Sequence, residues 1–264
     1  MDPVRIAIHG AAGRMGQRLV ALVKADPALI LAAAVDTPSH PRLGDDAGLV
    51  AGIGAIGVPL RDQIDAPTDV VVDFSVPKAT EAIAAWCVKS RTPLVVATTG
   101  LNDVQTAGLR AAAERIPLAW SPNMSLAVNL TMNLAEVAGR ALRDKNADVE
   151  ILERHHRFKE DAPSGTALRF GQIVARVMGQ TRHRHGREGR PGPRPHDEIG
   201  YHAIRVGDHP GEHTIVFAML GETVELTVRA TSRDCYALGA LVAAKYLIGK
   251  PPGLYGMNDV LGLG

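Results

Sequence analysis

The first half of the chain alternates short apolar runs with segments of helical spacing. The apolar runs predict strands over residues 4–9, 29–36, 69–75, 93–99 and 116–121, and the spacing between them predicts helices over 14–25, 78–90 and 102–115. Residues 38–59 are glycine-rich and irregular. Continuous apolar strands joined by helices are typical of a parallel sheet that is covered on both faces. The pattern therefore predicts an α/β fold with a Rossmann-type, doubly wound parallel sheet.

The pattern changes after residue 124. It predicts a long helix over 125–142, a strand over 147–158, a helix over 165–178, a polar loop over 181–200, strands over 201–206, 213–219 and 223–231, and a last helix over 234–247. Strands with short turns between them indicate a mixed or antiparallel sheet. We therefore expect a second, smaller α+β domain that begins between Asn123 and Ser125.

Composition narrows the class of protein. The chain has 264 residues, 46% hydrophobic and 22% charged, which is typical of a globular protein. A net charge of +1 and 4% aromatic residues argue against nucleic acid or a membrane as partner. No targeting segment and no membrane-length apolar run is visible, so we expect a cytoplasmic protein. Cys87 and Cys235 are expected to be buried, reduced thiols.

A glycine-spaced loop, Gly10-Ala11-Ala12-Gly13-Arg14-Met15-Gly16, joins the first predicted strand to the first predicted helix. Its G-x-x-G-x-x-G spacing is a variant of the dinucleotide-binding pattern. The glycines allow a tight turn and close approach of the backbone to a pyrophosphate, which the N-terminus of the helix attracts. A glycine-rich turn without a ligand is the alternative. We predict cofactor contacts from Gly10, Ala11, Ala12, Gly13, Arg14 and Met15.

Asp36 ends the second predicted strand and is the expected acceptor for a ribose diol. A helix cap or a solvated turn residue is the alternative. A carboxylate here repels a 2′-phosphate, and the next residue is Thr37 rather than arginine, so we predict that NADH is preferred over NADPH. The positive charge of Arg42 is expected to allow some NADPH binding.

Two further segments follow predicted strands, at the sheet edge where ligands of open α/β sheets bind. Each signal is weak alone, because such turns are common. The residues expected to line the cofactor there are Ala97, Thr98, Thr99, Ser121, Pro122, Asn123 and Met124.

The second half contains a basic cluster, His155-His156-Arg157-Phe158-Lys159, which runs into Ser164-Gly165-Thr166 at the start of a predicted helix. Titratable side chains beside a helix N-terminus can hold an anion and deliver a proton. If the strand continues that far, residues 155 and 159 share a face while His156 points away. The alternatives are a structural or exposed histidine, a surface lysine, and Ser164 as a helix N-cap.

A second basic segment, residues 182–190, carries His183 and His185. No carboxylate or cysteine stands at ligand spacing from them, so no metal site is expected. We interpret its arginines as part of a solvated loop near an anionic pocket rather than a nucleic-acid surface.

These motifs together resemble the 4-hydroxy-tetrahydrodipicolinate reductase family, also called dihydrodipicolinate reductase, over nearly the whole chain. The matching segments are the glycine loop, residues 97–100, residues 121–124, and above all residues 155–159 with 161–167. The resemblance implies a dinucleotide-binding domain over 1–124, rejoined by 234–264, and a substrate-binding and oligomerisation domain over 125–233. It also implies NADH or NADPH as cofactor and a homotetramer.

The resemblance implies residue roles as well. His155 is the expected proton donor or acceptor, Lys159 the proton donor, His156 a substrate contact, and Gly165 and Thr166 the ligands of a substrate carboxylate. The implied reaction reduces 4-hydroxy-tetrahydrodipicolinate, a small dicarboxylate, to tetrahydrodipicolinate and water in lysine and diaminopimelate biosynthesis. Ala97 stands where the family often has glycine, and Thr37 where it often has arginine.

Two other functions remain open from the sequence. One is a nucleotide-sensing regulatory protein that has lost its chemistry, against which the cluster around His155 and Lys159 argues. The other is a different dehydrogenase with the same two-domain plan that acts on an amino acid or a sugar.

Overall fold

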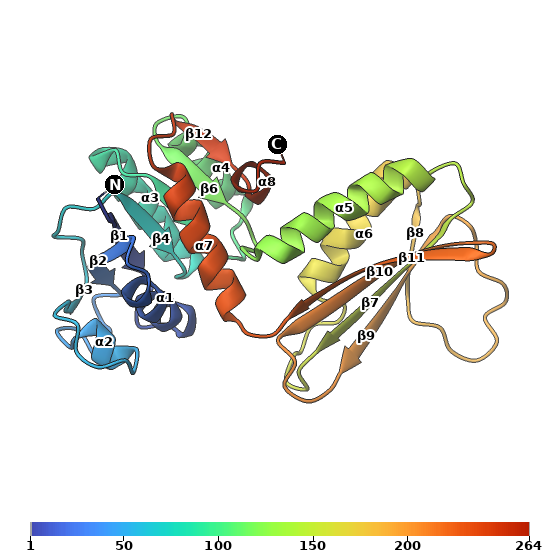
Figure 1. The fold of residues 1–264 in the computed structure, drawn as a ribbon, viewed down its shortest axis with the longest axis horizontal. Coiled ribbons are helices and arrows are strands. Elements are labelled where there is room, and N and C mark those ends of the chain that lie inside the picture. Colours follow the sequence, from blue (N-terminus) through green and yellow to red (C-terminus); the bar gives the residue numbers. More distant parts are fainter. Residues whose placement is uncertain (1, 264) are drawn as a thin grey trace. The chain divides into compact units, whose positions relative to one another are not determined.

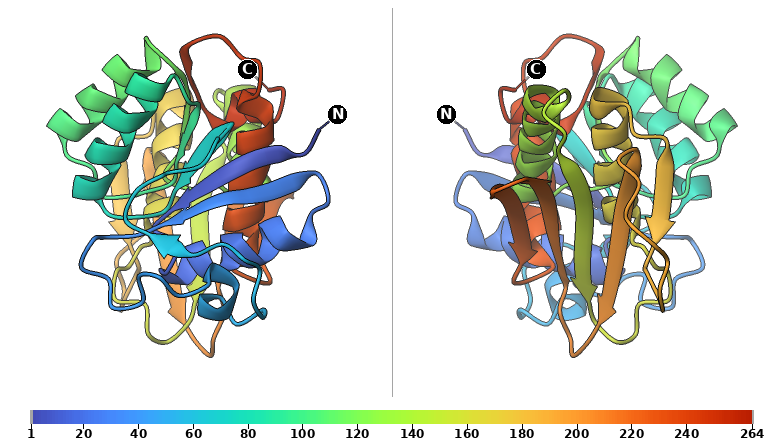
Figure 2. Two further views of the ribbon diagram at one scale, coloured as in Figure 1. Left: turned by 90° about the vertical axis from the view of Figure 1, so that its left-hand side faces the viewer. Right: turned by 90° about the vertical axis from the view of Figure 1, so that its right-hand side faces the viewer.

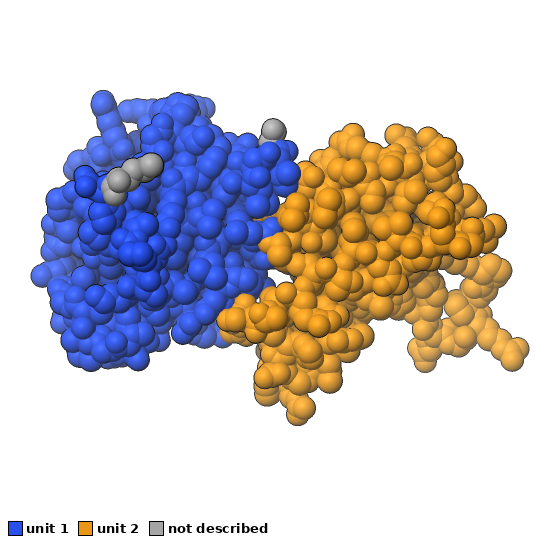
Figure 3. All heavy atoms as spheres, viewed as in Figure 1, with its two compact units in different colours: residues 1–126, 234–264 blue, residues 127–233 orange. Residues whose placement is uncertain are grey.

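The structure, a computed structural model, describes residues 2–263, which form two compact units. Unit 1 consists of the chain up to Leu126 together with the chain from Asp234 onward, and unit 2 of Ala127–Arg233 (Figure 3). The chain therefore leaves unit 1, builds unit 2 and returns.

A seven-stranded parallel sheet forms the centre of unit 1 (Figure 1). Its strands, in the order β12-β6-β5-β4-β1-β2-β3, are β12 (Gly253–Tyr255), β6 (Pro117–Trp120), β5 (Leu94–Val96), β4 (Val70–Asp73), β1 (Val4–His9), β2 (Leu29–Val35) and β3 (Leu60–Arg61). The chain runs outward from β1 to β3 and then returns to β4, on the other side of β1. The strand order therefore reverses between β1 and β4, which is where open α/β sheets bind ligands.

Helices cover both faces of this sheet (Figure 2). Helices α1 (Arg14–Ala25) and α7 (Asp234–Leu247) pack on one face, and α3 (Pro77–Ser90) and α4 (Asp103–Ala113) on the other. Val70, Val71 and Val72 of β4 are fully buried because neighbours cover both sides of the strand. The predicted doubly wound fold is confirmed.

Unit 2 is built on a five-stranded mixed sheet in the order β11-β10-β7-β9-β8. Its strands are β7 (Asp148–His155), β8 (Arg182–His185), β9 (Glu198–Arg205), β10 (Gly211–Met219) and β11 (Glu222–Ala230). Strand β10 pairs antiparallel with β7 and β11, whereas β7, β9 and β8 run parallel. Helices α5 (Leu126–Leu142) and α6 (Gly165–Met178) contribute to the core on one face of this sheet (Figure 1). The predicted α+β fold with a mixed sheet is confirmed.

Two predicted elements of unit 2 are wrong in their bounds. The strand predicted over 147–158 ends at His155, because the backbone then turns and Lys159 N–H donates to the carbonyl of His156 (3.2 Å). His155 and Lys159 therefore do not lie on one face of a common strand. The loop predicted over 181–200 contains β8, whose four exposed side chains have no apolar alternation that could have signalled a strand.

The irregular stretch predicted over 38–59 also contains a short helix, α2 (Ala47–Val50). The Asp46 carboxylate accepts hydrogen bonds from four backbone N–H groups, those of Gly48, Leu49, Ile56 and Gly57. One side chain therefore organises a segment without apolar periodicity. Two C-terminal elements, β12 and the short helix α8 (Met257–Val260), were likewise not predicted.

Both thiols are free, with Cys87 buried in α3 and Cys235 partly buried in α7. Among the helices of residues 2–263, none combines the length and the apolar character that crossing a membrane requires.

Candidate functional site

The loop after β1 has a shape that only glycine allows at two positions. Gly10 has a φ of +80°, and a Cβ atom there would lie 2.6 Å from the carbonyl oxygen of Phe74, which follows β4. A Cβ atom at Gly16 would collide with the backbone of Gly10 and Ala11. The first glycine therefore permits the turn at the point of strand reversal, and the third allows the close packing of α1 against the loop.

The start of α1 is suited to a phosphate group. Gly13 occupies the N-cap position, where no side chain of the described residues caps the helix. Backbone N–H groups of the first turn are consequently available, and the helix dipole favours an anion there. The loop therefore fits the pyrophosphate of a dinucleotide.

Asp36, directly after β2, is fixed beside this loop by its own hydrogen bonds. One carboxylate oxygen accepts from Ala12 N–H (2.9 Å) and the other from Thr37 N–H (2.8 Å). The carboxylate is thus held at the edge of the glycine loop, with lone pairs remaining for a further donor.

A buried carboxylate that the sequence analysis missed joins three adjacent strands. Asp73, at the end of β4, is fully buried and bonds to His9 Nδ1 at 2.7 Å. Ser75, Thr80 and Thr98 also donate their hydroxyl groups to it, at 2.5, 2.6 and 2.8 Å. Burial acts to raise the pKa of Asp73, but the hydrogen bond and charge of His9 and the hydroxyl donors outweigh it and leave the pKa below its usual value.

The other strand-end residues differ in their accessibility. The Thr98 side chain is committed to Asp73, and Met124 is buried in the core with its carbonyl group against Gly239 of α7. Thr99 and Pro122 are exposed, and Asn123 is partly exposed. Ala97 and Ser121 are buried as well, and the Ser121 hydroxyl donates to the Asn123 carbonyl (2.8 Å). Cofactor contacts from these four buried positions would therefore have to use the backbone, whereas Thr99, Pro122 and Asn123 present side chains as well.

In unit 2, a histidine and a glutamate lie on the buried face of β7. Glu153 and His155 are two residues apart, so their side chains point to the same side of the strand. One oxygen of Glu153 pairs with Nδ1 of His155, while the other accepts from Arg205 (2.8 Å) and from Ser164 N–H (3.2 Å). Burial acts to raise the pKa of Glu153, but the bonds from His155 and Arg205 lower it to about 2. The carboxylate is therefore ionised at neutral pH.

His213, on the adjacent strand β10, stands edge-on to His155 with 5.2 Å between the ring centroids. Its Nε2 lies 3.1 Å from the Ser164 hydroxyl, which also accepts from Ala167 N–H at the start of α6. We infer that the hydroxyl donates to Nε2. Burial, with the positive charge of His155 as a smaller cause, lowers the pKa of His213 to about 4, which agrees with a neutral imidazole.

Lys159 is connected to the same cluster. Its Nζ contacts Asp161 Oδ1 at 2.7 Å, and the backbone carbonyl of Asp161 accepts from Arg205 (2.6 Å), which in turn binds Glu153. The chain of contacts Lys159–Asp161–Arg205–Glu153–His155 places the two predicted proton carriers in one cluster, although not on one strand.

The remaining predicted substrate contacts lie next to this cluster. The side chain of His156 faces Arg233, with 3.5 Å between Nε2 and the guanidinium. Its pKa is lowered first by burial and then by the charges of Arg233, His155 and Lys159. A Cβ atom at Gly165 would meet no atom within 4 Å, so open space lies beside the start of α6. Thr166 follows in the first turn of that helix.

The sequence contained signals for the residues that were missed. Asp73 and His9 end buried strands, the same rule that singled out residues 97–100 and 121–124. In β7 the alternation Val149, Ile151, Glu153, His155 places two polar residues on an apolar face, which is informative because buried charges are rare without partners. His213 gave the same signal in β10, where it alternates with Ile215 and Phe217 on the buried face. Arg205 gave no comparable signal, because its role depends on the pairing of β9 with β7.

Glu153, His155 and His213 also offer possible metal-ligand atoms within 4.8 Å of one another. These atoms already serve other partners: the carboxylate binds Arg205 and Ser164 N–H as well as His155, and Nε2 of His213 binds the Ser164 hydroxyl. We therefore interpret the group as a hydrogen-bonded proton site.

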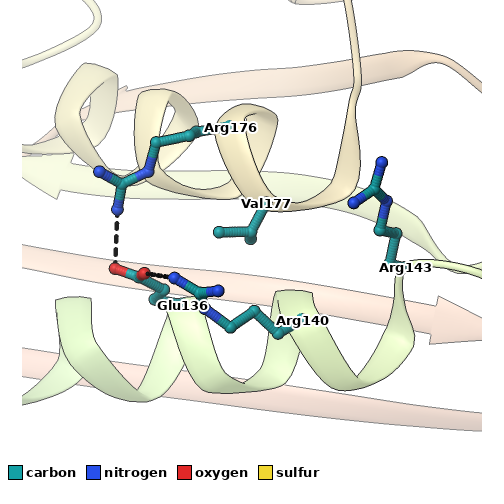
Figure 4. A pocket seen from close by; sticks show the side chains of 5 residues that line it. All are labelled: Glu136, Arg140, Arg143, Arg176 and Val177. Carbon is teal, nitrogen blue, oxygen red and sulfur yellow. Dashed lines mark hydrogen bonds and ion pairs between the residues drawn. The ribbon is translucent and has the colours of Figure 1, made fainter.

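A separate open pocket of about 550 Å³ lies between the C-terminal parts of α5 and α6 (Figure 4). Arg140, Arg143, Arg176, Val177 and Glu136 line it, and Glu136 pairs with Arg140 (2.5 Å) and Arg176 (2.8 Å). Cations near helix C-termini are favoured by the helix dipole, which accounts for the arginines. None of the predicted site residues lines this pocket.

The doubly wound sheet of unit 1 with its glycine loop, followed by a second α+β unit, is the plan of an oxidoreductase that uses a nicotinamide dinucleotide. Comparison with known families makes the class specific. Residues 4–124 match the family described as dihydrodipicolinate reductase, N-terminus, and residues 127–261 match dihydrodipicolinate reductase, C-terminus. The chain belongs to the dihydrodipicolinate reductase family.

Two relatives match this chain over nearly the whole length of both sequences. The chain is 57% identical to 4-hydroxy-tetrahydrodipicolinate reductase of Rhodopirellula baltica, covering 99% of this chain and 97% of the relative. It is 49% identical to the protein of the same name from Alkalilimnicola ehrlichii, covering 98% and 99%. Among solved structures, dipicolinate-bound dihydrodipicolinate reductase from Paenisporosarcina sp. TG-14 has the same fold, with a TM-score of 0.78 at 24% identity over 97% of this chain and 98% of that one.

Proposed function

We propose that this protein reduces 4-hydroxy-tetrahydrodipicolinate to tetrahydrodipicolinate and water with NADH or NADPH, in lysine and diaminopimelate biosynthesis. The observation that carries the proposal is the cluster of His155, Lys159 and the start of α6, in a chain that matches the family along its length. The family relationship also supports a small dicarboxylate as the substrate.

The reaction requires a hydride and one proton for each molecule of water released. The reduced nicotinamide, when bound, supplies the hydride. The Lys159 ammonium attracts the dicarboxylate and can donate a proton, and His155 can hold or release one. Asp161 holds Lys159 through a partly exposed ion pair, which a substrate carboxylate can replace at modest cost.

A substrate carboxylate is proposed to bind where α6 begins. The open space at Gly165 allows a ligand to approach the backbone, and the helix N-terminus with Thr166 favours an anion. His156, beside Arg233, supplies a further contact to the substrate.

For the cofactor we propose that the glycine loop holds the pyrophosphate and that Asp36 accepts from the ribose diol, which favours NADH. The carboxylate is fixed at the loop by Ala12 and Thr37, so it cannot turn away from a 2′-phosphate without breaking two hydrogen bonds. The exposed strand-end residues are proposed to complete the site.

We also propose that the protein assembles as a homotetramer through the sheet of unit 2. Alternation along the strands places Leu152, Val216 and Ile204 on the face opposite the α5 and α6 core, and Leu152 and Ile204 are exposed. The same face also carries charged residues, among them Glu150 and Glu212. Exposed apolar side chains within such a polar surface are suited to pairing with a second copy. Sedimentation of the purified chain should give four times the monomer mass, and a monomer would contradict this part of the proposal.

The test of the activity uses purified protein, enzymatically generated 4-hydroxy-tetrahydrodipicolinate and each cofactor in turn. We expect substrate-dependent loss of the reduced-nicotinamide absorbance, with a higher kcat/KM for NADH. Oxidation of neither cofactor would refute the function, whereas a large preference for NADPH would refute only the role of Asp36.

A further inference from the structure

The buried carboxylate of Glu153 has more donors than a simple ion pair needs. His155, Arg205 and the backbone of Ser164 all donate to it. These partners come from β7 itself, from β9 and from the start of α6, so the carboxylate has little freedom to rotate. A group fixed in this way can in turn fix the side chain that it binds.

The imidazole of His155 has one bound and one open nitrogen. An ionised carboxylate can only accept, so the bond to Glu153 places a proton on Nδ1. Nε2 has no hydrogen-bond partner among residues 2–263. It faces Gly211 at the start of β10, where a Cβ atom would come within 3.0 Å of it. The absence of a side chain at position 211 thus leaves room at the nitrogen that is not engaged by Glu153.

We propose that Glu153 is a positioning residue, which holds Nδ1–H of His155 so that Nε2 is the nitrogen that exchanges a proton with the substrate. This proposal rests on the function proposed above. The proton enters or leaves at Nε2, while Nδ1 keeps its own proton and Glu153 remains ionised.

The charges around the pair support this division of roles. Arg205 balances the carboxylate on the side away from His155, so Glu153 can stay ionised whether His155 is neutral or charged. His213 packs against the ring and is neutral, and therefore adds no competing charge. Further charges around the cluster are Lys159, which Asp161 neutralises, Arg233 beside His156, and Glu212, whose charge acts on His213.

The central experiment compares the pH dependence of kcat/KM for the wild type and Glu153→Gln, each in the full-length protein with NADH. Glutamine keeps the shape of the side chain but can present its amide N–H₂ to Nδ1, which favours the wrong tautomer. We expect kcat to fall about 10²-fold, with little change in KM for NADH. The limb of the profile that reports the coupled pair should move to lower pH, because the carboxylate that stabilises the protonated ring is gone.

Two variants make the result specific. Glu150→Gln is the matched control, because Glu150 lies on the same strand, pairs with His202 (2.7 Å) and two arginines, and also has a pKa lowered to about 2. It should leave the pH limb in place. Glu153→Asp retains the charge and should bring the limb back toward its wild-type position even if kcat stays low.

Nitrogen-15 NMR of the histidine side chains provides a readout that does not depend on turnover. The neutral form of His155 should carry its proton on Nδ1 in the wild type and lose this preference in Glu153→Gln. An Nε2–H tautomer in the wild type would overturn the proposal, as would an equal shift of the pH limb in Glu150→Gln. An inactive wild type with the Nδ1–H tautomer would instead refute the proposed function.

Discussion

The two units contain the same pair of groups, a histidine whose Nδ1 binds a buried carboxylate. In unit 1 the pair is His9 with Asp73, and in unit 2 it is His155 with Glu153. In both, burial acts to raise the pKa of the carboxyl group, and hydrogen bonds led by the histidine lower it again. The pairs therefore differ little in their own chemistry.

Their surroundings differ. Asp73 collects hydroxyl groups from the ends of neighbouring elements of unit 1, so its bonds tie strand ends together. Glu153 binds Arg205, which reaches the loop of Lys159, and the backbone N–H at the start of α6. The further partners of the carboxylate, rather than the pair itself, therefore separate a structural role from a positioning role.

The largest expected effect is on turnover. His155→Ala and Lys159→Ala should each lower kcat by about 10²–10⁴-fold, because general acid–base groups contribute that much, while NADH affinity stays nearly unchanged. Steady-state kinetics and NADH titration measure the two quantities. His9→Ala is the comparison variant and should affect stability far more than kcat. Near-normal turnover in both unit 2 variants would remove the contrast between the two pairs.

The next effect is on the stability of unit 1. Asp73→Ala leaves His9 and three hydroxyl groups without their acceptor, and breaking such a buried pair costs about 3–5 kcal/mol. Both tryptophans, Trp86 and Trp120, lie in unit 1, so urea unfolding followed by their fluorescence reports on this unit. Asp73→Asn retains an acceptor oxygen and should lose less. Equal stability of the alanine variant and the wild type would show that Asp73 does not hold the strand ends.

A smaller effect concerns acid stability in unit 2. The pKa of His213 is lowered to about 4 in the folded chain. Below the ordinary histidine pKa of about 6.5, the unfolded chain therefore binds a proton that the folded chain does not bind. The contribution of His213 to the free energy of unfolding is therefore fully present above about pH 6.5. It decreases as the pH falls toward 4, by about 2 kcal/mol between pH 7 and pH 5. Hydrogen exchange of the β10 amides at the two pH values measures the loss. His213→Gln should flatten this dependence, and an unchanged slope in the variant would contradict the assignment.

The smallest effect concerns the cofactor. Asp36→Ser removes the charge that opposes a 2′-phosphate, so the ratio of kcat/KM for NADPH to that for NADH should rise about tenfold. Glu114→Ser is a control, because Glu114 is an exposed carboxylate of unit 1 at the C-cap of α4. An unchanged ratio in Asp36→Ser would exclude a ribose contact from this residue.

The fold of unit 1 could be predicted because its strands are continuously apolar and its helices have clear spacing. Residues 6–8 of β1 and Val70–Asp73 are buried on both faces, and both segments are continuously apolar up to their last residues. Strand β8 could not be found, because Arg182–His185 is held by pairing with β9 and by His183 and His185 stacking on Tyr201. Such contacts join residues far apart in the sequence.

The chemistry of the candidate site could be predicted from the sequence, but the contacts that link its residues could not. The motif at 155–166 indicated a proton carrier beside an anion-binding helix start, and the structure links His155 to Lys159 through Glu153, Arg205 and Asp161. The reason given from strand periodicity was wrong, since β7 ends at His155. Arg205 joins the cluster because β9 pairs with β7, which no local pattern encodes.

A crystal structure of this protein with NADH and dipicolinate would test the central claim most directly, because it locates the ring relative to the two proton carriers. We predict that Nε2 of His155 and Nζ of Lys159 both lie within hydrogen-bond reach of the ligand, directly or through one water, with a carboxylate at Gly165. A ring bound away from these groups, for example against the arginines between α5 and α6, would contradict the account.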